Sequence, residues 1–384
     1  MYIVYYLFSL AGVVISYLFV YKTVLLVADQ KNYIVVKISI VINIIKTTIQ
    51  IIALLLYGNY IVYLAVGLCA NYANNFIASK KAEEEYPYLI KRTDGLDDFE
   101  KKNIFVNLKS VFLYKVSGLL LNATDNIFIS VLVNTATVGY YSNYLMINGK
   151  VTGFLSTGFG AITASIGNVI VTEREEKRYS IFQALQTVSY MLCGVVVATY
   201  LLLINDFINI WLGKEYIFDL MTVLTIALNL YLACVLQPIW SYREATGLYR
   251  KTKFIMLITA ALNVIFSLGF GMLWGIKGIL FASILSRMLT YIWYEPYLLF
   301  VEYFKKPVKE YYFGLMYNMA LIILATFINV TIVKRIVVNG WFILIFKAII
   351  VSGINIIIFM GAYYKTDGCK MIISKVKSLL QKWR

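Results

Sequence analysis

Eleven long apolar stretches constrain the fold of this sequence more than any other feature. Each holds about 20 residues, the length that an α-helix needs to cross a hydrocarbon core of roughly 30 Å. Strands of a membrane barrel would instead alternate apolar and polar residues over about 10 positions. We therefore predict an all-α integral membrane protein with spans near residues 3–21, 34–56, 60–78, 105–132, 138–165, 181–204, 217–239, 254–274, 277–299, 312–332 and 341–363.

The composition agrees with lipid as the main solvent of the chain. Hydrophobic residues make up 61% of the 384 residues and charged residues 14%, whereas a soluble domain carries about 25% charged residues. The net charge of +15 would suggest a nucleic-acid partner in a soluble protein. Here the basic residues stand between apolar stretches, so we interpret them as topology signals and expect no nucleic-acid partner.

The positions of Lys and Arg predict which side of the membrane each loop faces. Alternate loops and the C-terminal tail carry 24 basic residues, and the opposite loops carry only Lys214, Lys277, Lys334 and Arg335. Cytoplasmic loops hold the excess of basic residues, so we expect a multi-pass protein of the cytoplasmic membrane with its C-terminus in the cytoplasm. Eleven spans then place Met1 outside. The tail after Tyr364 is either a basic amphipathic helix at an anionic membrane surface or a solvated charged end.

Several kinds of chemistry are disfavoured by the residue content. The sequence has no histidine, which removes imidazole bases and most zinc sites. Its cysteines are widely spaced and form no CxxC motif, so we expect neither a disulfide framework nor a metal site. The predicted outer loops are short and offer no paired catalytic carboxylates. We therefore expect a protein that is not an enzyme.

Four basic residues lie well away from the ends of their predicted spans, where a central cation costs at least about 2.5–3.5 kcal/mol. Lys46, Lys150 and Arg287 are deepest, and Lys115 is nearer the cytoplasmic side. Their helices carry polar stripes, which face a bundle interior or a water-filled cavity more readily than lipid. The supporting polar residues are Asn43, Gln50, Asn122 and Asn143.

Asp125 is the only carboxylate that the predicted spans place well inside the membrane. One acid cannot neutralise several cations, so the expected cavity is net positive and fits an anionic head group such as pyrophosphate. Alternatively, each cation pairs with carbonyls, asparagine side chains or water. Asp125 either pairs with a lysine from another helix or binds a coupling Na⁺ or H⁺. We expect no other cofactor.

Ten segments, spread over about 300 residues, carry a resemblance to a known family of proteins. They are YKTVLLVADQKNYI (21–34), QIIALLLYGNYIVYL (50–64), YPYL (86–89), SGLLLNATDNIFIS (117–130), VGYYSNYLMI (138–147), ASIGNVIV (164–171), FINIWLGKEY (207–216), YREATGLYRKTKF (242–254), GIKGILFASILSR (275–287) and WYEP (293–296). No single segment is diagnostic, but in this order they resemble bacterial polysaccharide repeat-unit flippases of the multidrug/oligosaccharidyl-lipid/polysaccharide exporter superfamily.

This resemblance implies an alternating-access transporter for undecaprenyl-pyrophosphate-linked oligosaccharides that supply O-antigen, lipopolysaccharide or capsule. The family has about fourteen helices: six in each of two lobes and an accessory pair. Residues 21–34 resemble the family's segment after the fourth helix, so about three N-terminal helices have no counterpart here. The implied organisation is a partial N-lobe of three helices (1–78), a cytoplasmic linker (79–104), a six-helix C-lobe (105–300), an accessory helix pair (301–364) and a basic cytoplasmic tail (365–384).

The resemblance also implies partners: membrane lipid, the lipid-linked glycan, a polysaccharide polymerase and glycosyltransferases. Three other functions stay open. They are a small-molecule exporter of the same superfamily, a membrane polysaccharide polymerase or glycosyltransferase, and a truncated remnant that no longer transports. A basic cavity argues against cationic drugs as substrates, and the lack of paired acids argues against an enzyme.

Overall fold

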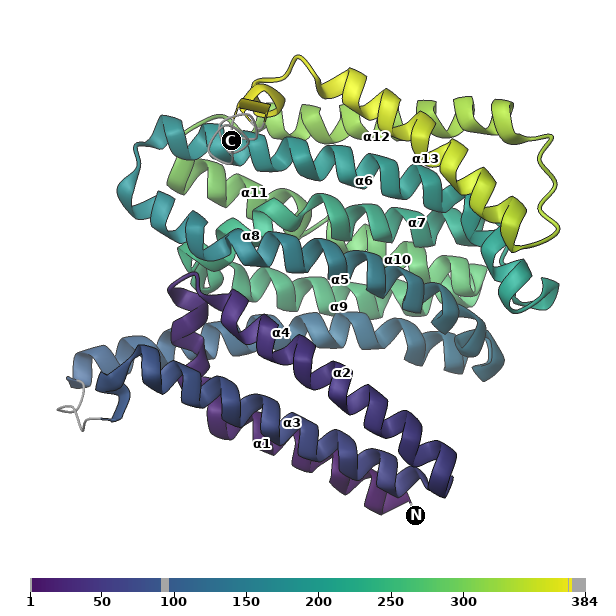
Figure 1. Cartoon of the computed structure of the whole chain (residues 1–384). Helices are drawn as coiled ribbons and strands as arrows, with labels where there is room; N and C mark the ends of the chain where they lie inside the picture. Colours follow the sequence, from purple (N-terminus) through teal and green to yellow (C-terminus); the bar gives the residue numbers. More distant parts are fainter. Residues whose placement is uncertain (1, 91–96, 372, 375–384) are drawn as a thin grey trace, which may run out of the picture. The chain divides into compact units, whose positions relative to one another are not determined.

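The computed structural model describes residues 2–90, 97–371, 373 and 374, and all regular secondary structure in this part of the chain is helical (Figure 1). Within these described residues, ten helices are long and apolar enough to cross a membrane, and an eleventh span results if one bent helix pair is counted as a single span. The prediction of an all-α, multi-pass membrane protein is therefore confirmed. The chain forms two compact units, residues 1–98 and 99–384.

The first unit contains three long helices and a short 3-10 turn: α1 (Tyr2–Ala28), α2 (Asn32–Tyr57), α3 (Tyr60–Glu85) and η1 (Pro87–Ile90). The tight connection between α2 and α3 follows from two residues. Gly58 ends α2 in the left-handed region (φ 58°), which glycine adopts without steric cost. Asn59 then caps α3, because its side chain accepts a hydrogen bond of 2.8 Å from the amide of Ile61.

Polar side chains tie the three helices of the first unit together. The amide of Asn71 in α3 donates to the carbonyl of Gly12 in α1 (2.9 Å). The hydroxyl of Ser39 in α2 donates to the side-chain oxygen of Asn74 in α3 (3.0 Å). Hydrogen bonds of this kind hold membrane helices together where lipid removes the hydrophobic drive for association.

The second unit contains the remaining helices, most of which run along one common direction in Figure 1. Their bounds are α4 (Asp98–Leu132), α5 (Thr135–Thr172), α6 (Glu175–Trp211), η2 (Lys214–Tyr216), α7 (Leu220–Val235), α8 (Gln237–Thr246), α9 (Tyr249–Trp274), α10 (Ile276–Met288), α11 (Tyr291–Leu299), the π-turn η3 (Phe300–Phe304), α12 (Lys309–Val333) and α13 (Trp341–Tyr363).

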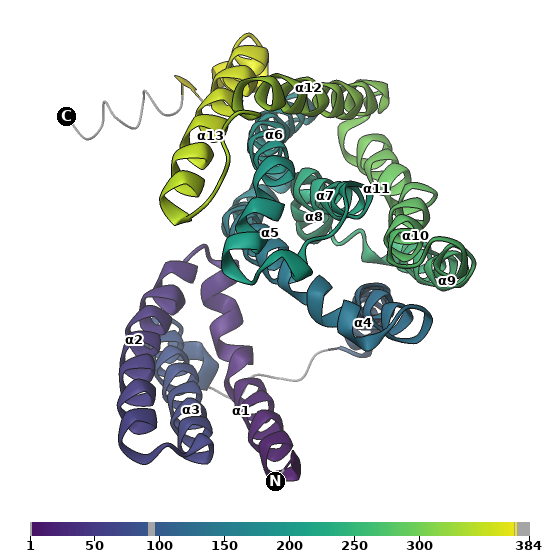
Figure 2. The same ribbon diagram turned by 90° about the vertical axis from the view of Figure 1, so that its right-hand side faces the viewer.

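Two helix contacts in this unit depend on glycine. A Cβ on Gly278 in α10 would lie 1.9 Å from the carbonyl oxygen of Phe270 in α9, and a Cβ on Gly194 in α6 would lie 2.1 Å from the ring of Phe359 in α13. Small residues let membrane helices approach this closely. They explain why α9 lies against α10, and α13 against α6, in both views (Figures 1 and 2).

Two membrane segments of the second unit are interrupted near their middle. Helices α7 and α8 meet at Leu236 with a bend of 41°, and Pro238 in the first turn of α8 cannot donate a backbone hydrogen bond there. Helices α10 and α11 meet at Leu289 and Thr290, where Thr290 leaves the helical region (φ −127°, ψ −106°). The sequence predicted both segments as continuous spans.

The helices also extend beyond the predicted spans. Much of the expected linker 79–104 is helical, because α3 continues to Glu85 and α4 begins at Asp98. Residues 91–96 lie outside the described part of the chain, and so does most of the predicted tail (372 and 375–384).

Candidate functional site

A polar cavity of about 270 Å³ lies among α4, α5, α7 and α10. Its lining combines one acid, one base, two amides and two hydroxyls with apolar side chains. The polar residues are Asp125, Tyr141, Asn148, Thr152, Asn229 and Arg287. Among the side chains that the structure describes, the oxygens of Asn148 and Asn229 are buried without a hydrogen-bond partner. Buried acceptors of this kind can receive a hydrogen bond or coordinate a cation.

Asp125 belongs to a hydrogen-bonded chain that crosses three helices. Its carboxylate accepts a hydrogen bond of 2.6 Å from Ser283 in α10. Ser283 accepts one of 2.8 Å from Asn263 in α9, and the side-chain oxygen of Asn263 accepts one of 2.7 Å from Thr124 in α4. Asp125 is 7% exposed, while Asn263 and Ser283 are fully buried. This series of hydrogen bonds holds one carboxylate oxygen of Asp125 toward the protein interior, and Asp125 also lines the cavity.

Arg287 stands one residue before the end of α10 and lines the same cavity as Asp125. The last carbonyls of a helix lack intrahelical partners and carry partial negative charge, which favours a cation at this position. Ala233, near the end of α7, also lines the cavity. The cavity therefore adjoins both interrupted membrane segments.

Lys150 lies on a different and larger hollow. This groove, of about 720 Å³, runs between α5 and α6 and has mostly apolar walls, with Gly149, Gly153 and Gly158 on the side of α5. Lys150 itself is exposed. Gly149 lines both the groove and the polar cavity, so Lys150 directly follows a residue that the two hollows share.

The other predicted residues of the second unit have separate positions. Lys115 is exposed on α4 and lines neither hollow. The amide of Asn143 donates to the carbonyl of Gly139 in its own helix (3.1 Å). Asn122 lies in α4, but its side chain is outside the described residues.

Lys46, Asn43 and Gln50 belong to α2 in the first unit. The ammonium of Lys46 donates to the side-chain oxygen of Asn43 one turn earlier (2.8 Å). Gln50 is buried and donates to the carbonyl of Tyr63 in α3 (3.0 Å). Within the second unit the structure thus brings Asp125 and Arg287 to one cavity, places Lys150 on the groove between α5 and α6, and leaves Lys115 on neither hollow.

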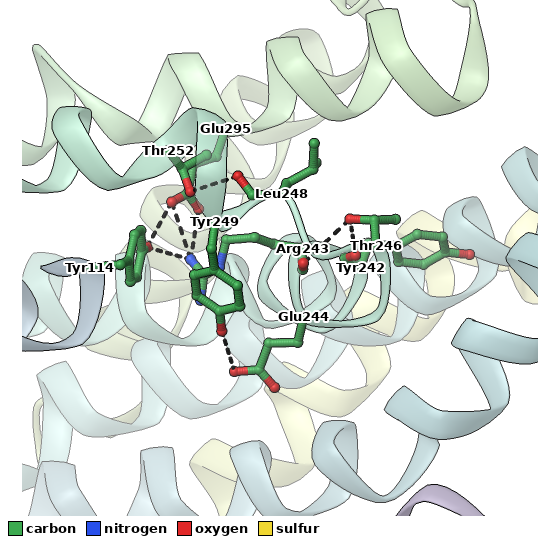
Figure 3. A network of polar contacts seen from close by, with 9 residues as sticks. All are labelled: Tyr114, Tyr242, Arg243, Glu244, Thr246, Leu248, Tyr249, Thr252 and Glu295. Carbon is green, nitrogen blue, oxygen red and sulfur yellow. Dashed lines mark hydrogen bonds and ion pairs between the residues drawn. The ribbon is translucent and has the colours of Figure 1, made fainter. Parts of the chain in front are cut away.

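Sequence reasoning missed a buried charged cluster at the joint of α4, α8 and α11 (Figure 3). Arg243 of α8 forms an ion pair of 2.9 Å with Glu295 of α11. Tyr114 of α4 accepts a hydrogen bond from Arg243 and donates one of 2.7 Å to Glu295. The guanidinium also lies over the rings of Tyr114 and Tyr249, with centroid distances of 4.4 and 5.3 Å. Such contacts stabilise a desolvated cation.

A second ion pair within the membrane-spanning helices involves Lys347 of α13. Its ammonium lies 2.7 Å from the carboxylate of Asp206, which joins α13 to α6. Within the described residues, no group of three or more His, Cys, Asp or Glu side chains could hold a metal ion. All four cysteines are free thiols.

Comparisons with protein-family models, with curated proteins and with solved structures found no match to this chain.

Proposed function

We propose that this chain moves an anionic, lipid-linked oligosaccharide across the cytoplasmic membrane, with an undecaprenyl-pyrophosphate-linked repeat unit as the substrate. One observation carries the proposal: the polar cavity that holds Asp125 and Arg287 adjoins two interrupted membrane helices. Transporters commonly build substrate and coupling-ion sites from discontinuous helices near the bilayer midplane. Ionisable groups that line a cavity inside the membrane commonly mark the pathway of a substrate or an ion.

The cationic side chains suit a pyrophosphate. Arg287 offers a planar fork that can bind two phosphate oxygens at once, and Lys150 offers a point charge. In this proposal the pyrophosphate approaches Lys150 at the groove and then Arg287 at the cavity. The unpartnered oxygens of Asn148 and Asn229 accept hydrogen bonds from sugar hydroxyls. The apolar tail stays in the bilayer beside α12 and α13.

Asp125 is the proposed coupling residue. Asp125 lines the cavity, and its carboxylate accepts a hydrogen bond from Ser283. In this position the carboxylate can bind Na⁺ or H⁺. The opposite charge of Arg287 belongs to the same cavity. Binding of a cation at Asp125 would then let Arg287 turn to the substrate anion. A two-lobed arrangement with alternating access, and cooperation with a polysaccharide polymerase and glycosyltransferases, are further parts of the same proposal.

The test is export of surface glycan in a strain that lacks its own repeat-unit flippase. We expect the chain to restore surface staining, and we expect Arg287→Ala and Lys150→Ala each to reduce it about tenfold or more, because each removes a charged hydrogen-bond donor from the anion. Arg287→Lys should be milder. Lys334→Ala, on an exposed residue after α12, is the matched control. Normal export by both Ala variants at wild-type protein level would contradict the proposal.

A further inference from the structure

A third hollow, of about 410 Å³, lies among the start of α6, the start of α12 and the end of α13. We propose that it binds the ammonium group of an amine-bearing phospholipid, with phosphatidylethanolamine as the membrane source. We call it the amine pocket. This inference is independent of the transported substrate, because none of the residues that line the polar cavity lines this pocket.

Among the described residues, two buried oxygens on the wall of the amine pocket have no hydrogen-bond partner. They are the side-chain oxygen of Gln186 and the hydroxyl of Tyr311, and both residues are 4% exposed. The nitrogen of Gln186 donates to the carbonyl of Val235 (3.2 Å). Because a carbonyl can only accept, this contact fixes the Gln186 oxygen as the end left without a partner. A buried oxygen without a partner costs free energy, which a ligand donor would recover.

The carboxylates at the pocket favour a ligand whose hydrogen-bond donor carries positive charge. Glu310 lines the pocket and accepts a hydrogen bond of 2.8 Å from Tyr179. Asp367 also lines it, and its carboxylate lies 3.3 Å from the ammonium of Lys370. Two carboxylates repel a phosphate but attract a cation. A primary ammonium group carries positive charge and donates only, so it matches both the carboxylates and the unpartnered oxygens.

Aromatic rings supply the remaining attraction. Tyr190 and Tyr363 stack with their centroids 5.9 Å apart, and both line the pocket together with Tyr179 and Tyr317. The ammonium of Lys306 already lies 5.7 Å from the ring centroid of Tyr179. The negative faces of such rings attract cations. Trimethylated ammonium would use these faces, but it could not donate to Gln186 or Tyr311.

The position of the pocket favours a lipid as the source of the amine. It lies where three membrane helices begin or end, which is the level of lipid head groups. Phe313 and Tyr317 on its border are 69% and 50% exposed, so the pocket has an apolar rim for a lipid chain. Lys306 and Lys370 stand at the same end of these helices and can meet the lipid phosphate.

Two glycines show that the pocket walls are closely fitted. A Cβ on Gly368 would lie 2.3 Å from the hydroxyl oxygen of Thr187, and a Cβ on Gly314 would lie 2.9 Å from the hydroxyl oxygen of Tyr190. Both glycines line the pocket. Their small size lets α12 and the turn after α13 close on α6.

The experiment measures lipid binding to the delipidated full-length protein in detergent by native mass spectrometry. The probes are phosphatidylethanolamine, its N-methyl and N,N-dimethyl forms, phosphatidylcholine and phosphatidylglycerol with identical chains. We expect affinity to fall with each methylation, reaching about tenfold for phosphatidylcholine, because each step removes one donor. Equal binding of phosphatidylethanolamine and phosphatidylcholine would overturn the proposal. Free ethanolamine binding as tightly as the lipid would overturn the lipid assignment.

Two variants locate the binding. Tyr311→Phe removes a hydroxyl that makes no hydrogen bond, and Glu310→Gln removes one exposed charge. We expect each to weaken phosphatidylethanolamine binding about fivefold or more and to reduce the preference over phosphatidylcholine. Melting temperatures without lipid should not change. The controls are Tyr200→Phe, which removes another buried hydroxyl without a partner, and Glu302→Gln, which removes another exposed carboxylate. Unchanged binding by both pocket variants would overturn the proposal.

Discussion

The guanidinium of Arg243 and the carboxylate of Glu295 form an ion pair of 2.9 Å, with side chains 8% and 2% exposed. Arg243 belongs to α8 and Glu295 to α11, the second halves of the two interrupted membrane segments. The pair therefore joins both interrupted segments at one end, and Tyr114 adds α4 to the joint. The polar cavity lies beside the breaks themselves, so this joint holds the two segments in register around it.

Breaking the Arg243–Glu295 pair should destabilise the protein strongly. Glu295→Leu or Arg243→Met leaves one buried group without its partner, and the expected loss is about 3–5 kcal/mol for each. The double variant Arg243→Met/Glu295→Leu should recover most of this loss, because no unpaired charge stays buried. Thermal unfolding of the purified protein in detergent measures the three variants. If the double variant lost the sum of the two single losses, the pair would not act as a unit.

Close packing of α13 on α6 should depend on Gly194. Gly194→Ala places a methyl group 2.1 Å from the ring of Phe359, so one of the helices must shift, at an expected cost of about 1–3 kcal/mol. Gly353→Ala in α13 adds the same methyl group where nothing lies within 4 Å, and it should be neutral or slightly stabilising. The melting temperatures of the two variants give the comparison. Equal melting would show that this contact is not close in the folded protein.

Asp125 should matter for transport and not for folding. Asp125→Asn keeps the volume of the side chain and an oxygen that can accept the hydrogen bond from Ser283, so we expect only a small change in melting temperature. We also expect surface glycan to fall about tenfold or more, since a hydrogen bond to a charged group is typically worth about 1.5–3 kcal/mol. Staining of the complemented strain measures this effect, with Glu302→Gln as the control. Full export by Asp125→Asn would remove Asp125 from the mechanism.

The contacts that join the turn between α1 and α2 to the end of α3 should persist over a wide pH range. The ammonium of Lys31 lies 2.8 Å from Glu85, and this hydrogen bond raises the pKa of Lys31 to about 12. The hydroxyl of Tyr86 donates to Asp29 (2.8 Å) and, with Lys31, holds the pKa of that carboxyl below its usual value.

The signs of these two pKa shifts set the pH window. The stabilisation from Asp29 is fully present above its ordinary pKa of about 3.9 and is lost as the pH falls through the lower folded pKa. The stabilisation from Lys31 is fully present below its ordinary pKa of about 10.4 and is lost as the pH rises through the folded value. Hydrogen exchange at the turn should therefore show constant protection from about pH 5 to 9. A step in protection inside that range would contradict this assignment.

The sequence was a good guide to the membrane spans and to Asp125. Runs of about 20 apolar residues report helices directly, because lipid leaves the backbone no other partner than itself. An acid within such a run is costly, so the sequence alone places Asp125 toward a protein interior or a cavity, and in the structure it lines a cavity. The same holds for Arg287.

The sequence was a poor guide to pairings between helices. Arg243 and Glu295 are 52 positions apart, and the spans predicted near 217–239 and 277–299 put Arg243 in a loop and Glu295 at a span end. After the break at Leu236 the segment continues as α8, and Arg243 is buried on this helix. Lys347 and Asp206 likewise lie at the ends of separate spans, and only the packing of α13 on α6 joins them. Hydropathy indicates which segments lie in the membrane, but it carries no information about which helix is the neighbour.

Translocation in proteoliposomes tests the central claim most directly. The purified chain is reconstituted with a polyprenyl-pyrophosphate-linked oligosaccharide, and a membrane-impermeant lectin reports how fast the inner-leaflet glycan reaches the outside. The account predicts translocation well above protein-free vesicles, and a reduction of about tenfold or more for Arg287→Ala. A rate equal to that of protein-free vesicles, or an unchanged rate for Arg287→Ala, would contradict it.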